Sequence, residues 1–179
     1  MLEGRLVRLR ALKSDDARVS FEWRNDFDLV SLQGGNFLPV SAEREREWID
    51  TAVKNDSNNL RLAIEVRDGG KYIGNVGLTS IDWRNRRGEF GIFIGDRSEW
   101  GKGYGQDATR TMLGFAFNEL NLARVYLSVR VDNRPAINIY EKCGFRQEGL
   151  LRGHLFRGGR YLDVYCMGIL RQEFAGDAV

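Results

Sequence analysis

The chain has 179 residues, of which 42% are hydrophobic, 29% are charged and only 2 are proline. This balance is typical of globular proteins and excludes disordered and collagen-like chains, and the length predicts one domain spanning residues 1–179. Lysine and arginine number 27 against 25 acidic residues. The resulting net charge of +2 is too small for the electrostatic field of a dedicated nucleic-acid binder.

Cysteine usage and hydropathy bear on metal binding and location. Cys143 and Cys166 lie outside any C-x-x-C spacing, so the sequence predicts neither a disulfide framework nor a zinc ribbon. No stretch approaches the ~20 apolar residues of a membrane span, and residues 1–5 lack the layout of a signal peptide. We therefore expect a cytoplasmic protein with no metal site and no membrane partner.

The N-terminal third predicts one strand followed by two helices. Residues 7–11 alternate apolar and basic side chains with the period of a strand, and Ser14 before two aspartates marks a helix start. The second helix is predicted from Ser41 as N-cap to about residues 54–55. Its charged run 43–47 predicts a solvated face. Its apolar stripe is expected to comprise Trp48, Ile49, Ala52 and Val53.

The middle of the chain predicts an antiparallel meander. Residues 60–66 alternate as a strand does, and Asp-Gly-Gly at 68–70 supplies a turn before the β-rich run 71–80. A polar turn at 85–87 then leads into a further strand over 89–94.

The C-terminal half predicts a β-α-β-α crossover and a closing hairpin. The run 100–106 is too rich in glycine for a helix, yet apolar residues follow at helical spacing over 108–120. Residues 124–130 predict a strand, and the next helix contains Pro135 in its first turn and stops near residue 144. The runs 150–156 and 161–169 predict the hairpin, and the whole order predicts an α/β (α+β) fold.

The glycine cluster is the sharpest chemical feature. Glycine lets backbone N–H groups approach a ligand closely, and a helix N-terminus favours negative charge. A phosphate is therefore the expected ligand. The spacing excludes a nucleotide P-loop, because Lys102 is followed by Gly103 where Ser or Thr is required. Gln106 stands where a dinucleotide-binding fingerprint read from Gly101 has its last glycine. The alternative to a phosphate loop is a structural turn.

A second motif begins at Asn133 and reads Asn-Arg-Pro-Ala-Ile-Asn-Ile-Tyr-Glu-Lys-Cys-Gly-Phe. Together the two segments resemble the GNAT superfamily of acetyl-CoA-dependent N-acetyltransferases. In that family the pyrophosphate loop reads Q/R-x-x-G-x-G/A and a later helix carries N-x-x-A-x-x-x-Y-x-K-x-G-F. The second motif matches throughout, whereas in the first Trp100 stands where Gln or Arg is usual. Residues 86–90 and 156–164 are similar to the spermidine and ribosomal-protein N-terminal acetyltransferase branch.

The resemblance implies a mixed, mostly antiparallel central sheet with a splayed parallel strand pair, flanked by helices, and acetyl-CoA as the co-substrate. It implies that the acetyl carbonyl and pantetheine arm pair with the backbone of Ile92, Phe93 and Ile94. The pyrophosphate would bind the loop, whose members are Gly101, Lys102, Gly103, Tyr104, Gly105 and Gln106. From the later helix Asn133, Ala136 and Lys142 would contact the cofactor, although a solvated surface role is the alternative for Lys142.

By the same resemblance, Tyr140 is the expected general acid, which protonates the departing thiolate; its alternative is a packed helix aromatic. Glu89 is the leading candidate for the base, directly or through water. An ion pair between Glu89 and Arg86 or Arg87 is the alternative. The sole histidine, His154, is expected to face solvent or the substrate mouth, and hydrolase motifs are absent. An acetyl-cysteine intermediate on Cys143 is disfavoured, because a buried structural cysteine is far commoner.

The acceptor amine stays open between a polyamine-like small molecule and a protein N-terminal α-amine. Polyamine enzymes of the branch carry adjacent carboxylates after the first helix, whereas this chain has Leu-Gln-Gly-Gly-Asn-Phe at 32–37. The rival class is a non-catalytic acetyl-CoA-binding or regulatory module on the same fold. A nucleic-acid module, suggested only by the basic runs at 5–10 and 84–87, is not expected. A homodimer is compatible with the branch, but the sequence identifies no interface.

Overall fold

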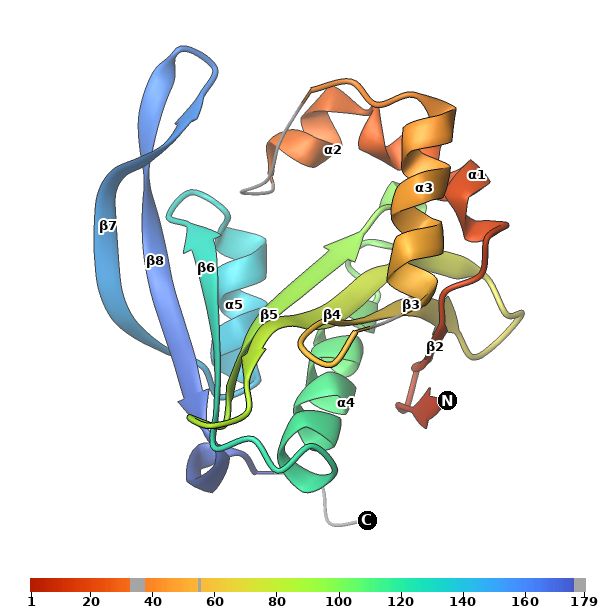
Figure 1. The fold of residues 1–179 in the computed structure, drawn as a ribbon. Helices are drawn as coiled ribbons and strands as arrows, with labels where there is room; N and C mark the ends of the chain where they lie inside the picture. The colour runs from red at the N-terminus through yellow and green to blue at the C-terminus, as the bar shows by residue number, and fades with distance from the viewer. Residues whose placement is uncertain (33–37, 55, 176–179) are drawn as a thin grey trace.

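The structure, a computed structural model, describes residues 1–32, 38–54 and 56–175. Its centre is an eight-stranded sheet of order β1-β2-β3-β4-β5-β6-β8-β7 (Figure 1). The strands are β1 (Leu2–Glu3), β2 (Val7–Ala11), β3 (Leu60–Val66), β4 (Tyr72–Asp82), β5 (Arg87–Ile94), β6 (Arg124–Arg130), β7 (Arg146–Arg157) and β8 (Arg160–Leu170). Neighbouring strands are antiparallel except β5 and β6, which run parallel. The predicted mixed sheet is therefore confirmed.

Helices cover both faces of this sheet. They are α1 (Asp16–Arg24), α2 (Phe27–Ser31), α3 (Ala42–Val53), α4 (Tyr104–Asn118) and α5 (Arg134–Lys142), with the 3-10 turns η1 (Arg97–Glu99) and η2 (Arg171–Glu173). The main hydrophobic core lies between the sheet and the pair α4 and α5, and a smaller one lies under α1 and α3. No helix in the described parts of the chain is long and apolar enough to span a membrane.

Local sequence signals account for most of these boundaries. Ser41 caps α3 by accepting a hydrogen bond from the Arg44 amide (3.2 Å), as predicted. Pro135 lies in the first turn of α5, and Gly144, with φ of 98°, follows its end. The short elements β1 and α2 were not predicted, because two and five residues are too few to show a periodicity.

The predicted apolar stripe of α3 is wrong in part. Ile49 and Ala52 are buried, but Trp48 and Val53 each remain 38% exposed. Glu45 takes their place in the buried stripe, so the expectation of a fully solvated charged face over 43–47 is also wrong. The Glu45 carboxylate is tolerated there because it accepts a hydrogen bond from the Ser20 hydroxyl (2.5 Å) and lies 3.8 Å from the Arg24 guanidinium.

The parallel pair β5 and β6 separates soon after it begins. Residues 87–89 of β5 pair with residues 124–126 of β6, and no further pairing follows along the remainder of β5 (Figure 1). Residues 92–94 therefore have a strand neighbour, β4, on one side only. This divergence is the splayed strand pair that the resemblance implied.

Candidate active site

The divergence leaves backbone groups of β5 without strand partners. The Gly95 amide donates to the Ile73 carbonyl of the β4 side (2.9 Å), whereas the Ile94 carbonyl accepts a hydrogen bond from the Trp100 indole (3.0 Å). Since backbone direction alternates along a strand, the amides and carbonyls of Ile92 and Ile94 face the opening toward β6. Those of Phe93 face β4. The structure thus separates the three predicted backbone partners into two that line the opening and one that does not.

The glycine loop precedes α4 as predicted. Gly101 and Gly103 adopt left-handed backbone conformations, with φ of 76° and 89°, which favour glycine. The first amide of α4 with a backbone partner is that of Asp107, which donates to the Gly103 carbonyl (3.0 Å). In the described parts of the chain, the amides of residues 101–106 have no hydrogen-bond acceptor. Such free amides at a helix start suit a pyrophosphate.

Close packing places this loop beside the end of β5 and beside α5. A Cβ atom added at Gly105 would lie 3.5 Å from Ile139 of α5 and 3.9 Å from Ile94 of β5. The Cys143 thiol lies 3.7 Å from the Gln106 carbonyl. The predicted loop and Ile94 are therefore brought together. The exposed Lys102 ammonium forms an ion pair with Glu99 (2.8 Å).

Asp107 is a residue of this region that the sequence reasoning missed. Its carboxylate accepts hydrogen bonds from the amides of Arg5 (3.1 Å), Leu6 (2.7 Å) and Val7 (3.0 Å). These contacts attach the start of β2 to the first turn of α4. An acidic residue in the first turn of a helix was the available signal, but its partners lie a hundred residues away in the chain.

The motif residues at the start and end of α5 have separate positions. Asn133 caps α5 by accepting from the Ala136 amide (3.3 Å), and its side-chain amide donates to the Leu32 carbonyl (3.5 Å). Ala136 packs partly buried against the main core. Lys142 is exposed at the end of α5. Asn133 and Ala136 thus lie at the start of α5, and Lys142 lies at its end.

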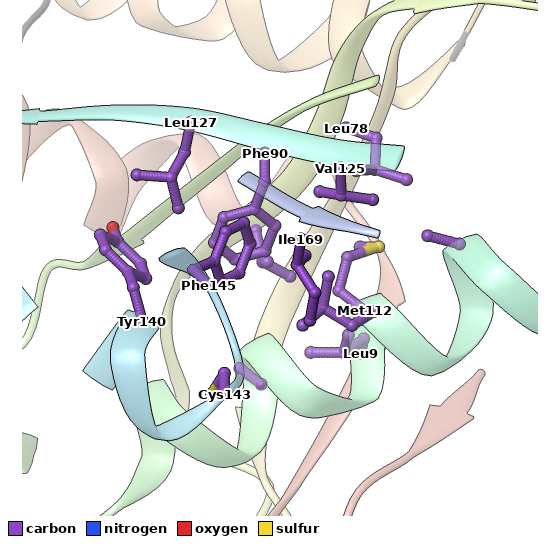
Figure 2. Close-up of a cluster of buried hydrophobic side chains, with 14 of the residues drawn as sticks. Leu9, Leu78, Phe90, Met112, Val125, Leu127, Tyr140, Cys143, Phe145 and Ile169 are labelled. Atoms are coloured by element: carbon purple, nitrogen blue, oxygen red, sulfur yellow. The ribbon is translucent and has the colours of Figure 1, made fainter. Parts of the chain in front are cut away.

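Tyr140 lies on the buried face of α5, at the edge of the main core (Figure 2). Its ring centroid is 6.2 Å from that of Phe90 and 5.8 Å from that of Phe145, in both cases edge to face. Burial raises the pKa of the Tyr140 phenol to about 12. In the described residues its hydroxyl has no hydrogen-bond partner, and Figure 2 shows it pointing away from the middle of the cluster. Tyr140 thus presents a protonated phenol.

Glu89 lies on the opposite face of the sheet from Tyr140. Because side chains alternate along a strand and Phe90 packs against Tyr140, the Glu89 side chain points toward the α1 side. Phe93, on that same face, packs edge to face against Trp23 of α1 (6.2 Å). The acid and base candidates therefore flank the diverging strands from opposite faces.

The Glu89 carboxylate has no ion pair in the described residues. Arg86 donates instead to the backbone carbonyl (2.7 Å) and side-chain oxygen (2.6 Å) of Asn121, and Arg87 lies 3.5 Å from Asp82. The predicted alternative, an ion pair between Glu89 and either arginine, is therefore wrong. A half-buried carboxylate without a charged partner remains available to accept a proton.

Comparison with a family model decides the identity. Residues 6–146 match the acetyltransferase (GNAT) domain. The chain belongs to the GNAT acetyltransferase family. It is an acetyl-CoA-dependent N-acetyltransferase, and the free amides of residues 101–106 fit that co-substrate. Among the described residues of this GNAT enzyme, no group of three or more His, Cys, Asp or Glu side chains is arranged to hold a metal ion.

Individual relatives narrow the branch. The spermidine N(1)-acetyltransferase of Vibrio cholerae is 34% identical over 169 residues, which cover 94% of this chain and 95% of the relative. The putative ribosomal N-acetyltransferase YdaF of Bacillus subtilis is 33% identical over 140 residues, covering 78% and 76%. A crystal structure of the Vibrio cholerae spermidine enzyme in complex with CoA and spermine superposes with a TM-score of 0.85 at 32% identity, covering 94% and 97%.

Substitution of Gly103 tests the amide loop of this GNAT enzyme. Gly103→Ala should weaken acetyl-CoA binding about 10-fold by calorimetry, because a side chain in the left-handed region costs roughly 1–2 kcal/mol and shifts the amides. Gly114→Ala is the matched control, since it lies inside α4 with nothing within 4 Å of an added Cβ. It should leave the affinity unchanged and slightly raise the melting temperature. Equal affinities for Gly103→Ala and the parent would contradict the assignment.

Cys143 should be dispensable for acetyl transfer. Burial raises the pKa of its thiol to about 11. Because the thiol is protonated below its pKa, only about one part in 10³ is the nucleophilic thiolate at pH 8. Cys143→Ala should therefore retain acetylation within about 3-fold, and intact-mass spectrometry of the parent mixed with acetyl-CoA alone should show no acetylated enzyme. A stable acetyl adduct on Cys143 would reverse this conclusion.

Proposed function

We propose that this GNAT enzyme transfers the acetyl group directly to a primary amine of polyamine type, with Tyr140 as general acid and Glu89 as general base. The observation that carries the proposal is the placement of a free carboxylate and a protonated phenol on opposite faces of the diverging strands. The acceptor class is supported by the similarity to the Vibrio cholerae spermidine enzyme.

Binding in this proposal relies on main-chain groups. The amides of residues 101–106 hold the pyrophosphate. The backbone of Ile92 and the amide of Ile94, which face β6, hydrogen-bond the extended arm, while the Ile94 carbonyl keeps its bond from the Trp100 indole. Acetyl-CoA supplies the acetyl group as a thioester. The loop and strand thereby aim the thioester toward the part of the opening that Tyr140 and Glu89 flank.

Proton transfer is the task of the two side chains. An alkyl ammonium of pKa ~10.4 is neutral in only about one part in 10³ at pH 7, which corresponds to roughly 4–5 kcal/mol. Glu89 supplies the acceptor for the ammonium proton, directly or through water, so that the neutral amine forms beside the thioester. As the C–N bond forms and the C–S bond breaks, Tyr140 donates its hydroxyl proton to the sulfur. The phenol is restored by the proton that the acylated nitrogen releases.

A protein N-terminal α-amine is the second candidate acceptor. The similarity to the putative ribosomal N-acetyltransferase YdaF supports it. An α-amino group has a pKa of ~7.7–8.0, so it demands much less of Glu89. The argument against polyamines rests on the run at 32–37, and residues 33–37 of that run lie outside the described residues. We also propose that the protein is cytoplasmic, since both cysteines are free thiols. Residues 1–179 are our proposed single domain.

A steady-state panel tests the function. Thiol release from acetyl-CoA should be measured with spermidine, amino sugars and short N-terminal peptides. The proposal expects the highest kcat/KM for spermidine-type amines. Preference for the peptides would favour the second candidate. Acetyl-CoA binding without thiol release on any amine would favour the non-catalytic module.

A further inference from the structure

The five-residue helix α2 lies near the carboxyl ends of β5 and β6, where the two strands are far apart, and its two ends are attached to different sides of that opening (Figure 1). At its start, the Asp26 side chain accepts from the Leu29 amide (3.1 Å) and from the Arg97 guanidinium (2.6 Å). Arg97 belongs to η1, which follows β5 in the chain. The β5 side of the opening therefore holds the first turn of α2.

The β6 side holds the last turn of α2. Arg130, the final residue of β6, donates from Nη1 to the Ser31 carbonyl. Its remaining nitrogens bind the Asp132 carboxylate at 2.9 and 2.7 Å, so the guanidinium fork is fixed in orientation. The Arg130 side chain is only 10% exposed. Asn133 adds a longer contact to the Leu32 carbonyl (3.5 Å).

Arg130 and Glu89 share one face of the sheet. Val125, Leu127 and Val129 of β6 pack into the core under α4 and α5, so Arg130 points to the other face. Glu89 points to that face as well, as argued above. An isolated helix of five residues is unstable in water, so α2 depends on such tertiary contacts for its position.

We propose that Arg130 is a positioning residue for the acceptor amine. By holding the end of α2 across the diverging strands, it fixes the side of the acceptor site that lies opposite Glu89. This inference rests on the proposed function, because it places the acceptor on the Glu89 face. Arg130 itself need not touch the amine: it acts through the Ser31 carbonyl and the helix that carries it.

The test is Arg130→Met, which keeps the length of the stem and removes the hydrogen-bonding fork. We expect the KM for the best amine of the panel to rise about 10-fold, while kcat and the acetyl-CoA dissociation constant change less than about 2-fold. Hydrogen exchange without substrates should be faster at the amides of residues 29–32. Arg130→Lys, which keeps the charge but not the fork, should recover only part of the KM.

Arg124→Met is the matched control. Arg124 lies on the same strand and the same face, and its guanidinium also binds a carboxylate, that of Glu148, which lies away from α2. Its replacement should leave the amine KM and the exchange of residues 29–32 unchanged. If Arg130→Met does not fold, Asp132→Asn loosens the same fork while Arg130 stays in place, and it should raise the KM in the same direction.

The outcomes separate this inference from the function on which it rests. Acetylation by the parent together with an unchanged KM in folded Arg130→Met, or in Asp132→Asn where that variant is used, overturns the positioning role and leaves the proposed function intact. A fall in kcat with an unchanged KM also overturns it. Absence of acetylation by the parent on every amine overturns both.

Discussion

Tyr140→Phe should lower turnover by about 10²-fold and leave the affinity for acetyl-CoA unchanged. The substitution removes one hydroxyl and keeps the ring that packs between Phe90 and Phe145, so the fold and the cofactor loop stay intact. What is lost is the proton donor for the departing thiolate. Steady-state kinetics and calorimetry with acetyl-CoA measure the two quantities separately.

The raised pKa of Tyr140 also predicts how the turnover of the parent depends on pH. Tyr140 acts in its protonated form, and burial raises its pKa to about 12. A group that must keep its proton stays active below its pKa. Ionisation of Tyr140 should therefore cause no loss of turnover between pH 7 and pH 10. A phenol in water has a pKa of ~10, so it would already be half ionised at pH 10.

Tyr165→Phe provides the control for the Tyr140 variant. Tyr165 packs partly buried against the same core from β8, so its replacement removes a comparable hydroxyl without touching the proposed acid. Its turnover should equal that of the parent. Parent-like turnover in Tyr140→Phe would remove the acid role and return Tyr140 to a packing residue of α5.

Glu89→Gln should lower kcat/KM for an alkyl amine by about 10²-fold at pH 7. Glutamine has nearly the same shape, and the Glu89 carboxylate has no ion pair in the described residues that the change would break. The variant must rely on the small fraction of neutral amine in solution. Its rate should therefore increase about tenfold per pH unit, and its deficit should narrow as the pH approaches the pKa of the acceptor.

Glu148→Gln is the control for this second prediction. It removes a carboxylate of β7 that is bound to Arg124, so it should affect stability slightly and the pH profile not at all. Superimposable pH profiles for Glu89→Gln and the parent would exclude Glu89 as the base. The proton would then have to leave through water alone.

The amino-acid sequence by itself determined most helices and strands and the glycine loop before α4. The signals there are local: Ser41 and Pro135 mark helix starts within one turn, and the free amides before α4 follow from Gly101 and Gly103 in left-handed backbone. The family motif that contains Tyr140 is equally local, since it covers only α5 and the few residues that end it.

Only the tertiary structure decided what depends on partners distant in the chain. It left Glu89 without an ion pair, because Arg86 donates to Asn121 and Arg87 pairs with Asp82. It buried Glu45, whose partner Ser20 lies on another helix, and it attached α2 to η1 and to β6, which follow much later in the sequence. Periodicity and capping report on neighbours within a few residues, whereas these contacts form when separate elements pack, so no local pattern encodes them.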